Sequence, residues 1–239
     1  MTRDRPAEDH DPLTASLLRL LHLSDSAFPV GAFAYSDGLE TAVVDGFVRN
    51  ADDLSVWLAD FLDDVFVPCE GLAVRLAMAA LASDDWSALE RLDQELTAMR
   101  PSAATRSSSR TLGQRFLKSF HPLYGCPATH HLAEAIAQGA MVGNAPVVHG
   151  VAHESLGTPR RAAIAAFGYT RLVAMTSAAL RLFPVGQQAA QAVLAVQVAR
   201  LPALVTAVES AEPELRSFVP RFDVEQMNHR YVYSRMFRS

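Results

Sequence analysis

The chain has 239 residues, of which half are apolar and 20% are charged, so it can bury the core of one large domain or two small ones. Its net charge of −5 is unevenly divided, because residues 1–100 carry 19 acidic and 7 basic residues whereas residues 101–239 carry 7 acidic and 14 basic ones. A general nucleic-acid binder is expected to be basic overall, so this balance excludes DNA and RNA as favoured partners and points to proteins.

The first third of the chain is predicted to be helical from residue 12 onward. Residues 1–11 lack the apolar segment of a signal peptide, and we expect them to be disordered. Asp11-Pro12 matches a helix cap followed by proline at the first helical position, and the leucines that follow supply a broad apolar face. A short helix is expected at 38–48, and apolar residues at helical spacing predict an amphipathic helix over 52–66.

Proline and glycine are expected to divide the middle of the chain. Pro68 and Gly71 interrupt the helical pattern that begins at residue 52, and Pro101 ends the helix predicted over 86–99. In the stretch 102–120 we expect helix only in the second half, because its serines favour a mobile or capping segment.

The last third predicts two long Ala-rich helices, over 159–182 and 184–200, joined by a corner at Pro184-Val185-Gly186. A final helix is expected from about Asp223, where Gln226 completes a capping-box pattern. No β alternation or internal repeat is present. The sequence therefore predicts one all-α domain over 12–239, with roughly ten helices arranged like a helical bundle.

No uninterrupted apolar run approaches the roughly 20 residues of a membrane-spanning helix, so we expect a cytoplasmic protein that does not contact a membrane. Cys69 and Cys126 lie far apart and show no CxxC spacing. Buried free thiols are the favoured interpretation in a reducing compartment.

His149 and His153 are the most tempting candidates for metal ligands, because residues four apart share one helix face. The glutamate of this motif, Glu154, follows the second histidine, so the pattern is not that of a zinc protease. A third ligand would have to come from His121, His130, His131 or Cys126. Nothing in the spacing selects one of these, and we favour histidines that satisfy hydrogen bonds over a metal site.

Catalytic motifs are missing from the sequence. It contains neither GxSxG nor GxxxxGK[ST], which argues against a serine hydrolase and a P-loop nucleotidase. The acidic pairs at 52–53, 63–64 and 84–85 fit helix starts or a solvated helix face better than acid–base catalysis. We therefore predict a binding protein that is not an enzyme and holds no cofactor.

Two stretches place unusual demands on the backbone. In 28–40, "FPVGAFAYSDGLE", the proline fixes φ and the glycines allow positive φ, which suggests a rigid recognition corner or a loop with aromatics in the core. In 180–187, "LRLFPVGQ", an arginine lies among apolar residues, and we expect it to form a structural ion pair. The residues predicted to build these corners are Pro29, Gly31, Tyr35, Gly38, Glu40, Arg181, Pro184 and Gly186.

The chain ends in "YVYSRMFRS", with three aromatics and two arginines, whereas chain ends are usually small, polar and frayed. Aromatic residues, methionine and arginine are enriched in interfaces. We predict that the tail, residues 223–239, docks on a partner; packing against the chain's own core is the alternative. The residues predicted to contact the partner are Tyr233, Arg235, Met236, Phe237, Arg238 and Ser239.

Taken in order, these stretches resemble the urease accessory proteins of the UreF family. The resemblance rests on "FPVGAFAYSDGLE", "SRTLGQRFL", "LRLFPVGQQAAQ" and "FDVEQMNHRYVYSRMFRS", and it spans residues 17–239. Three positions depart from the family pattern: Ala32 replaces a second glycine, Ala34 a serine, and Arg230 a glutamate.

The resemblance implies an all-α homodimeric scaffold without catalytic activity of its own. It also implies binding of an accessory protein of the UreD (UreH) type, which contacts apo-urease, and recruitment of the nickel-carrying GTPase UreG for nickel insertion and urease maturation. Two alternatives stay open. The chain supplies an arginine, Arg181 or one in the tail, to hydrolysis on the GTPase, or it carries nickel on His149 and His153.

Overall fold

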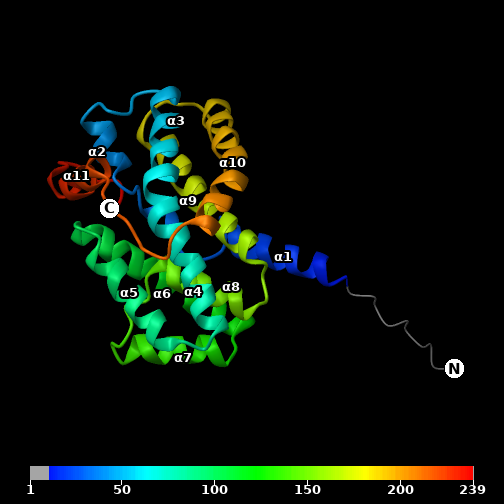
Figure 1. Cartoon of the computed structure of the whole chain (residues 1–239). Coiled ribbons are helices and arrows are strands. Elements are labelled where there is room, and N and C mark those ends of the chain that lie inside the picture. The colour runs from blue at the N-terminus through cyan, green and yellow to red at the C-terminus, as the bar shows by residue number, and fades with distance from the viewer. Residues whose placement is uncertain (1–10, 239) are drawn as a thin grey trace.

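The fold was analysed in a computed structural model, which describes residues 11–238. The described residues form helices and no strand, as expected for an all-α single domain (Figure 1). Of the segment 1–11 predicted to be disordered, residues 1–10 fall outside the described residues, as does the predicted contact of Ser239, whereas Asp11 is described and caps the first helix.

The first helices begin where the sequence predicts. Helix α1 covers Pro12–Ser24, and the Asp11 carboxylate accepts a hydrogen bond from the Leu13 N–H at 3.0 Å. A 3₁₀ turn, η1, covers Ala32–Ala34, and α2 covers Leu39–Val44.

Helix α3 (Ala51–Asp60), the π-helical segment η2 (Phe61–Glu70) and α4 (Gly71–Ala82) follow without a break. The predicted interruption at Pro68 and Gly71 is therefore wrong. Proline removes one helical hydrogen bond, and the wider π turn around it absorbs the change in register. Buried apolar residues on both sides of Pro68, such as Phe66 and Leu72, pack this continuous rod against the core.

Helix α5 covers Trp86–Ala98, and α6 covers Ala103–Tyr124. The expectation that the first half of 102–120 is not helical is wrong. Ser102 does act as the N-cap, but Ser108 and Ser109 lie inside the helix, where the Ser108 hydroxyl donates to the Thr105 carbonyl. The Ser109 hydroxyl accepts a hydrogen bond from the Ala145 N–H on the neighbouring helix, so tertiary contact outweighs the capping preference.

The remaining helices are α7 (Pro127–Ala137), α8 (Ala145–Ser155), α9 (Arg160–Leu182), α10 (Gln187–Ser210) and α11 (Pro220–Asn228), followed by the 3₁₀ turn η3 (His229–Tyr231). The predicted corner at 184–186 is confirmed, and α10 continues through Pro202. Helix α11 begins at Pro220, not near Asp223. The predicted capping box is therefore wrong, and Asp223 lies in the first turn.

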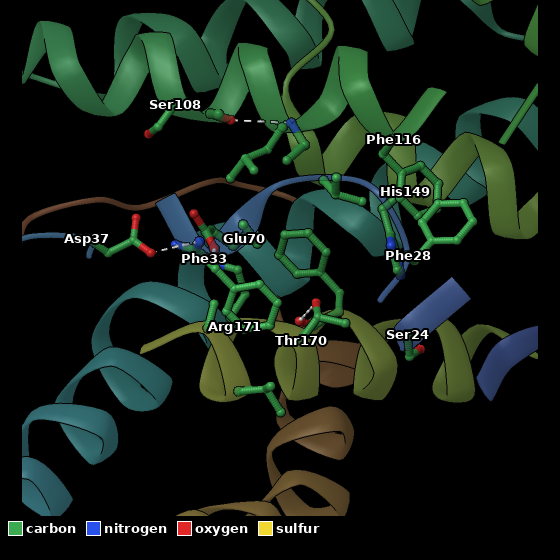
Figure 2. Close-up of a pocket in the computed structure, with 18 of the residues that line it drawn as sticks. Ser24, Phe28, Phe33, Asp37, Glu70, Ser108, Phe116, His149, Thr170 and Arg171 are labelled. Carbon is green, nitrogen blue, oxygen red and sulfur yellow. Dashed lines mark hydrogen bonds and ion pairs between the residues drawn. The ribbon is translucent and has the colours of Figure 1, made fainter. Parts of the chain in front are cut away.

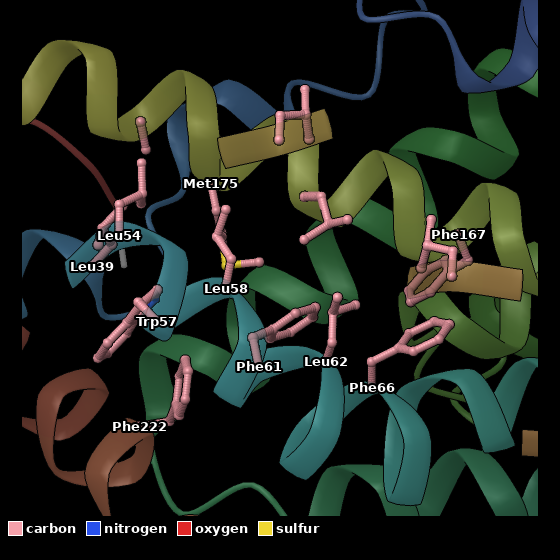
Figure 3. Close-up of a cluster of buried hydrophobic side chains, with 14 of the residues drawn as sticks. Leu39, Leu54, Trp57, Leu58, Phe61, Leu62, Phe66, Phe167, Met175 and Phe222 are labelled. Atoms are coloured by element: carbon pink, nitrogen blue, oxygen red, sulfur yellow. The ribbon is translucent and has the colours of Figure 1, made fainter. Parts of the chain in front are cut away.

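Two clusters of buried apolar side chains hold the helices together. One lies between the α3–η2 rod, α9 and α10, where the Trp57 and Phe222 ring centroids are 4.1 Å apart (Figure 3). The other lies between α4, α6 and α8 around Phe120, Leu72 and Val151. Helix α9 contacts both groups, so it forms the centre of the fold.

Three helical stretches are long and apolar enough to cross a membrane by length and composition alone: Ala51–Ala82, Arg160–Leu182 and Gln187–Ser210. The search for uninterrupted apolar runs missed them because each contains charged residues. All three contribute residues to the first core cluster, although most of the apolar stretch of Gln187–Ser210 is not buried inside the protein.

Candidate functional site

The predicted corners and the tail meet at one place, although up to about 200 residues separate them in sequence. We call this place the tail junction. It comprises Phe33, Ala34, Glu40, Arg181, His229, Met236, Phe237 and Arg238. In Figure 1 the C-terminal end lies beside α2 and α11.

Glu40 is the centre of the tail junction. Its buried carboxylate contacts the His229 Nε2 at 2.7 Å and accepts hydrogen bonds from the backbone N–H groups of Met236 at 2.6 Å and Phe237 at 3.2 Å. Three partners on one carboxylate fix the path of the last residues. Glu40 is placed at the start of α2 by Gly38, whose φ of +85° favours glycine.

Arg181 joins the second corner to the first corner and to the tail. Its Nη1 donates to the Phe33 carbonyl at 2.9 Å, and its guanidinium lies 4.5 Å from the centre of the Phe237 ring. The Arg238 N–H donates to the Ala34 carbonyl at 2.9 Å. The expected ion pair of Arg181 is therefore replaced by a carbonyl bond and a cation–π contact, and the arginine itself is exposed.

The other corner residues have different environments. Tyr35 is buried in the core, whereas Pro29, Pro184 and Gly186 are exposed. Gly186 has a φ of +74° and precedes α10. Gly31 also has a positive φ, and it lies close to the Arg115 side chain.

The tail residues predicted to bind a partner divide into two groups. Phe237 is only 4% exposed and fills a site in the chain's own core, so its ring is not available on this surface. Tyr233, Arg235, Met236 and Arg238 are exposed. The tail is thus ordered on the chain's own core before any partner is added, while most of its aromatic, methionine and arginine side chains face solvent.

Arginines on this face have no carboxylate partner among the described residues. This holds for Arg235 and Arg238, and Arg230 lies 4.6 Å over the ring of its neighbour Tyr231. The nearby carboxylate of Glu225 is buried, and burial raises the pKa of this group. The surface around the tail therefore presents positive charge and aromatic rings together.

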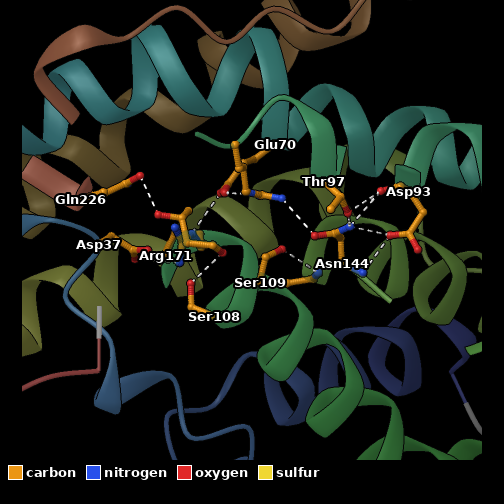
Figure 4. A network of polar contacts seen from close by, with 12 residues as sticks. Asp37, Glu70, Asp93, Thr97, Ser108, Ser109, Asn144, Arg171 and Gln226 are labelled. Atoms are coloured by element: carbon orange, nitrogen blue, oxygen red, sulfur yellow. Dashed lines mark hydrogen bonds and ion pairs between the residues drawn. The ribbon is translucent and has the colours of Figure 1, made fainter. Parts of the chain in front are cut away.

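A buried polar network lies beside the tail junction, and sequence reasoning missed it (Figure 4). Arg171 of α9 contacts Asp37 at 2.8 Å and Glu70 at 3.0 Å, and Glu70 also accepts from Arg100 at 3.0 Å. Burial alone would raise the pKa of Glu70, but the two guanidinium groups lower it below its ordinary value. The same contacts to Asp37 and Glu70 raise the pKa of Arg171 despite its burial.

The network continues through Arg100, which donates to the Asn144 side chain at 3.1 Å. Asp93 then accepts three backbone hydrogen bonds, from Val142, Gly143 and Asn144, at 2.6 to 2.8 Å. These contacts fix the turn before α8 on the end of α5. The network is a structural frame in which two arginines hold Asp37 and Glu70, and backbone N–H groups hold the third carboxylate, Asp93.

A cavity of about 110 Å³ lies between α6, α8 and α9 under the first corner. Figure 2 shows Asp37, Glu70 and Arg171 toward one end and Phe116 and His149 toward the other. Its charged end consists of the paired carboxylates and guanidiniums described above. Asp25 also lines the cavity, and its carboxylate accepts a hydrogen bond from the Ala27 N–H.

The two histidines of α8 are buried and hydrogen-bonded. His149 Nε2 contacts the Ala163 carbonyl at 3.1 Å, and His153 Nδ1 contacts the Thr158 hydroxyl at 3.1 Å. Burial lowers the pKa of His149 well below its ordinary value and the pKa of His153 to about 4. Among residues 11–238, no group of three potential metal ligands was found.

The remaining candidates do not join these histidines. The His121 and His130 rings lie 4.3 Å apart between α6 and α7, and His131 packs on Trp86. Both cysteines are free; burial raises the pKa of Cys69 to about 12. Cys126 caps α7 and is only partly buried. Burial raises the pKa of its thiol, but hydrogen bonds from Thr129, Ser155 and Ala128 outweigh burial and lower this pKa below its ordinary value.

Comparison with known proteins gives a consistent result. The UreF family model matches residues 48–197. A protein named urease accessory protein UreF from Methylorubrum populi is 35% identical over 93% of this chain and 98% of its own length. Proteins of the same name from Kocuria rhizophila and Lachnoclostridium phytofermentans are 32% and 29% identical, over 96% and 93% of this chain and 99% and 98% of their own lengths.

Proposed function

Because the chain belongs to the UreF family of urease accessory proteins, we propose that it is a scaffold that links a UreD (UreH)-type accessory protein to the nickel-carrying GTPase UreG. In this function the chain acts as a homodimer in the cytoplasm and reaches apo-urease through the complex. It promotes nickel insertion without catalysing a reaction itself.

The observation that carries the proposal is the tail. The tail junction holds residues 229–238 in a defined path, and Tyr233, Arg235 and Met236 project from it into solvent. A surface that is already ordered loses less conformational entropy on binding. Its arginines fit an acidic partner surface, and its aromatic and methionine side chains fit apolar pockets.

The test must keep the fold intact. Truncation after Gln226 removes Phe237 from the core and leaves Glu40 buried without partners. A loss of binding by the truncated chain could therefore come from a disturbed fold and would not test docking alone. We therefore compare the double variant Tyr233→Ala/Arg235→Ala with the control Tyr169→Ala/Arg110→Ala, which removes an exposed tyrosine and an exposed arginine from α9 and α6. Each is co-expressed with a tagged UreD-type protein and captured.

The tail variant is expected to lose capture while the control retains it, both with wild-type helicity. Equal capture of all three forms would contradict the docking role of the tail. Capture of neither variant would point to a general loss of folding, which circular dichroism detects.

A specific observation also favours the alternative in which the chain regulates the GTPase. Arg235 and Arg238 are exposed and have no carboxylate partner among the described residues, whereas Arg181 is engaged by Phe33 and Phe237. An arginine finger must be free to reach the nucleotide. Single-turnover GTP hydrolysis by UreG with each Arg→Ala variant tests this; a slower rate with unchanged binding supports it, and an unchanged rate excludes it.

A further inference from the structure

The cavity between α6, α8 and α9 is not explained by the docking role of the tail. Its volume is about 110 Å³. An engineered apolar cavity of about 150 Å³ binds benzene, so this one has room for a molecule of about five non-hydrogen atoms. Asp25 and Phe33 line the cavity and are exposed, which places its opening to solvent beside the first corner.

Aromatic rings form much of the cavity wall. Four phenylalanines belong to the lining: Phe28, Phe33, Phe116 and Phe167. The Phe28 and Phe116 ring centroids are 5.5 Å apart, and Figure 2 shows both rings at the end where His149 lies. The face of an aromatic ring attracts a cation that lies within about 6 Å of its centre. Such a wall accepts apolar groups and organic cations, and it disfavours anions.

The charged groups of the lining do not cancel one another. Asp37 and Glu70 are paired with Arg100 and Arg171 in the buried network. Asp25 is a third carboxylate of the lining, and it has no ion pair among the described residues. The hydrogen bond that it accepts, at 2.7 Å, comes from a backbone N–H two residues later in the chain. The lining therefore carries one excess negative charge, which one monovalent cation balances.

Hydrogen-bond acceptors without a partner belong to the same lining. Asp25 is the C-cap of α1, so the negative end of this helix lies there. The Ser24 hydroxyl oxygen is buried and has no hydrogen-bond partner among the described residues. His149 Nε2 donates to a backbone carbonyl, and burial lowers the pKa of this ring well below its ordinary value. The neutral ring therefore keeps a lone pair on Nδ1, and no described residue donates to it.

A metal ion fits this lining poorly. Proteins hold metal ions with several carboxylate, imidazole or thiolate ligands, and within residues 11–238 no group of three such residues could hold one. Asp25 would supply a single carboxylate beside an aromatic wall. An uncharged apolar molecule would fit the wall but would leave the carboxylate and the acceptors without a partner. The remaining class is a molecule with an apolar body and a positively charged donor.

We propose that the cavity binds a small organic cation, namely a protonated amine whose apolar body has about four carbon atoms. The ammonium group donates to the Asp25 carboxylate and to the unpartnered acceptors, and the body packs on the phenylalanine rings. This binding requires neither the UreD-type protein nor the GTPase, because every group that it uses belongs to this chain.

The experiment measures binding of n-butylammonium to the purified full chain by isothermal titration calorimetry and saturation-transfer NMR. This amine is protonated at pH 7, because the pKa of an alkyl amine such as lysine is about 10.4. 1-Butanol is the matched uncharged probe, and butyrate is the matched anion. Nickel(II) is the metal probe, and it is added to the chain both alone and in competition with butylammonium.

Butylammonium is expected to bind at one site with a Kd on the order of 1 mM, as is ordinary for so small a ligand. Butanol and butyrate are expected to bind at least about ten-fold more weakly. Equal binding of butanol would show an apolar cavity without selectivity for charge. Tighter binding of butyrate, or displacement of butylammonium by nickel, would likewise overturn the proposal.

Asp25→Asn tests the charge of the site, because it removes the negative charge and keeps an oxygen that accepts the backbone hydrogen bond. It is expected to weaken binding of butylammonium by about ten-fold and to leave binding of butanol unchanged. Asp45→Asn is the matched control, because Asp45 is likewise an exposed C-cap, that of α2. Wild-type affinity of Asp25→Asn for butylammonium, or an equal loss in the control, would contradict the proposed site.

A cavity-filling variant tests the location of the amine. Ala174→Leu fills the cavity from α9, and Ala32→Leu, at a half-buried position of the first corner, replaces it if circular dichroism shows that the first variant is not folded. A folded filling variant is expected to bind butylammonium at least about ten-fold more weakly than the wild type. Wild-type affinity in a folded filling variant would place the amine outside the cavity and overturn the proposal.

Discussion

Replacing Glu40 by alanine should detach the tail from the body of the protein. The carboxylate holds His229 at 2.7 Å and the N–H groups of Met236 and Phe237 at 2.6 and 3.2 Å, all in a buried setting. A hydrogen bond to a charged group contributes about 1.5–3 kcal/mol, but these three are not additive because the tail can leave as a unit. We expect a loss of about 3 kcal/mol, most of it local to the tail.

Hydrogen exchange measures this loss directly. A loss of about 3 kcal/mol corresponds to exchange about 100-fold faster at the amides of Met236, Phe237 and Arg238. Glu40→Gln keeps an acceptor oxygen and the side-chain shape, so it should show a smaller increase. Glu134→Ala removes an exposed carboxylate on α7 and should leave these amides unchanged. If Glu40→Ala leaves protection of the tail amides at the wild-type level, the proposed role of this carboxylate is wrong.

Three further predictions concern the frame around the site. Gly38→Ala should destabilise the protein by about 1 kcal/mol more than Gly46→Ala in urea unfolding, because both have positive φ but only Gly38 would bring a Cβ to 3.1 Å from an α11 side chain. Burial lowers the pKa of His153 from 6.5 to about 4, so the unfolded chain binds the proton first as the pH falls. Up to about 3 kcal/mol of the stability that is present above pH 6.5 should therefore be lost between pH 6.5 and pH 4. His153→Gln should reduce this pH dependence of the free energy of unfolding. Arg171→Met should lower the free energy of unfolding by about 3–5 kcal/mol, because it leaves Asp37 and Glu70 buried without this partner. The pKa of Glu70 in the folded chain lies below its ordinary 4.5, so the stability that this carboxylate contributes is present above pH 4.5 and is lost as the pH falls through the folded pKa. Urea unfolding of the Arg171→Met variant should therefore depend less on pH below 4.5 than unfolding of the wild type.

Much of the helical pattern follows from local sequence signals. Asp11 and Asp85 cap helices as their residue types predict, and the corner at 184–186 lies between two long helices. Local rules failed where tertiary contact was stronger. Pro68 lies within a continuous rod, and the serines near residue 108 are buried against a neighbouring helix.

The site was predictable in its parts and not in its assembly. Glu40, Arg181 and the tail were each identifiable as unusual, but nothing local indicates that Glu40 contacts His229, which lies 189 residues away. Likewise, no sequence pattern around Arg171 indicates that this arginine is buried against Asp37 and Glu70. The available signal was a charged residue within an apolar helical stretch, which implies a distant partner without naming it.

Radical footprinting of the co-expressed complex with a UreD-type protein tests the docking role of the tail most directly. Tyr233 and Met236 are exposed in the free chain, and both side chains react readily with hydroxyl radicals. The proposed function predicts that both lose reactivity in the complex, while Tyr169 on α9 remains as reactive as in the free chain. Unchanged reactivity of Tyr233 and Met236 in a complex that forms stably would contradict the claim that the tail is the docking surface.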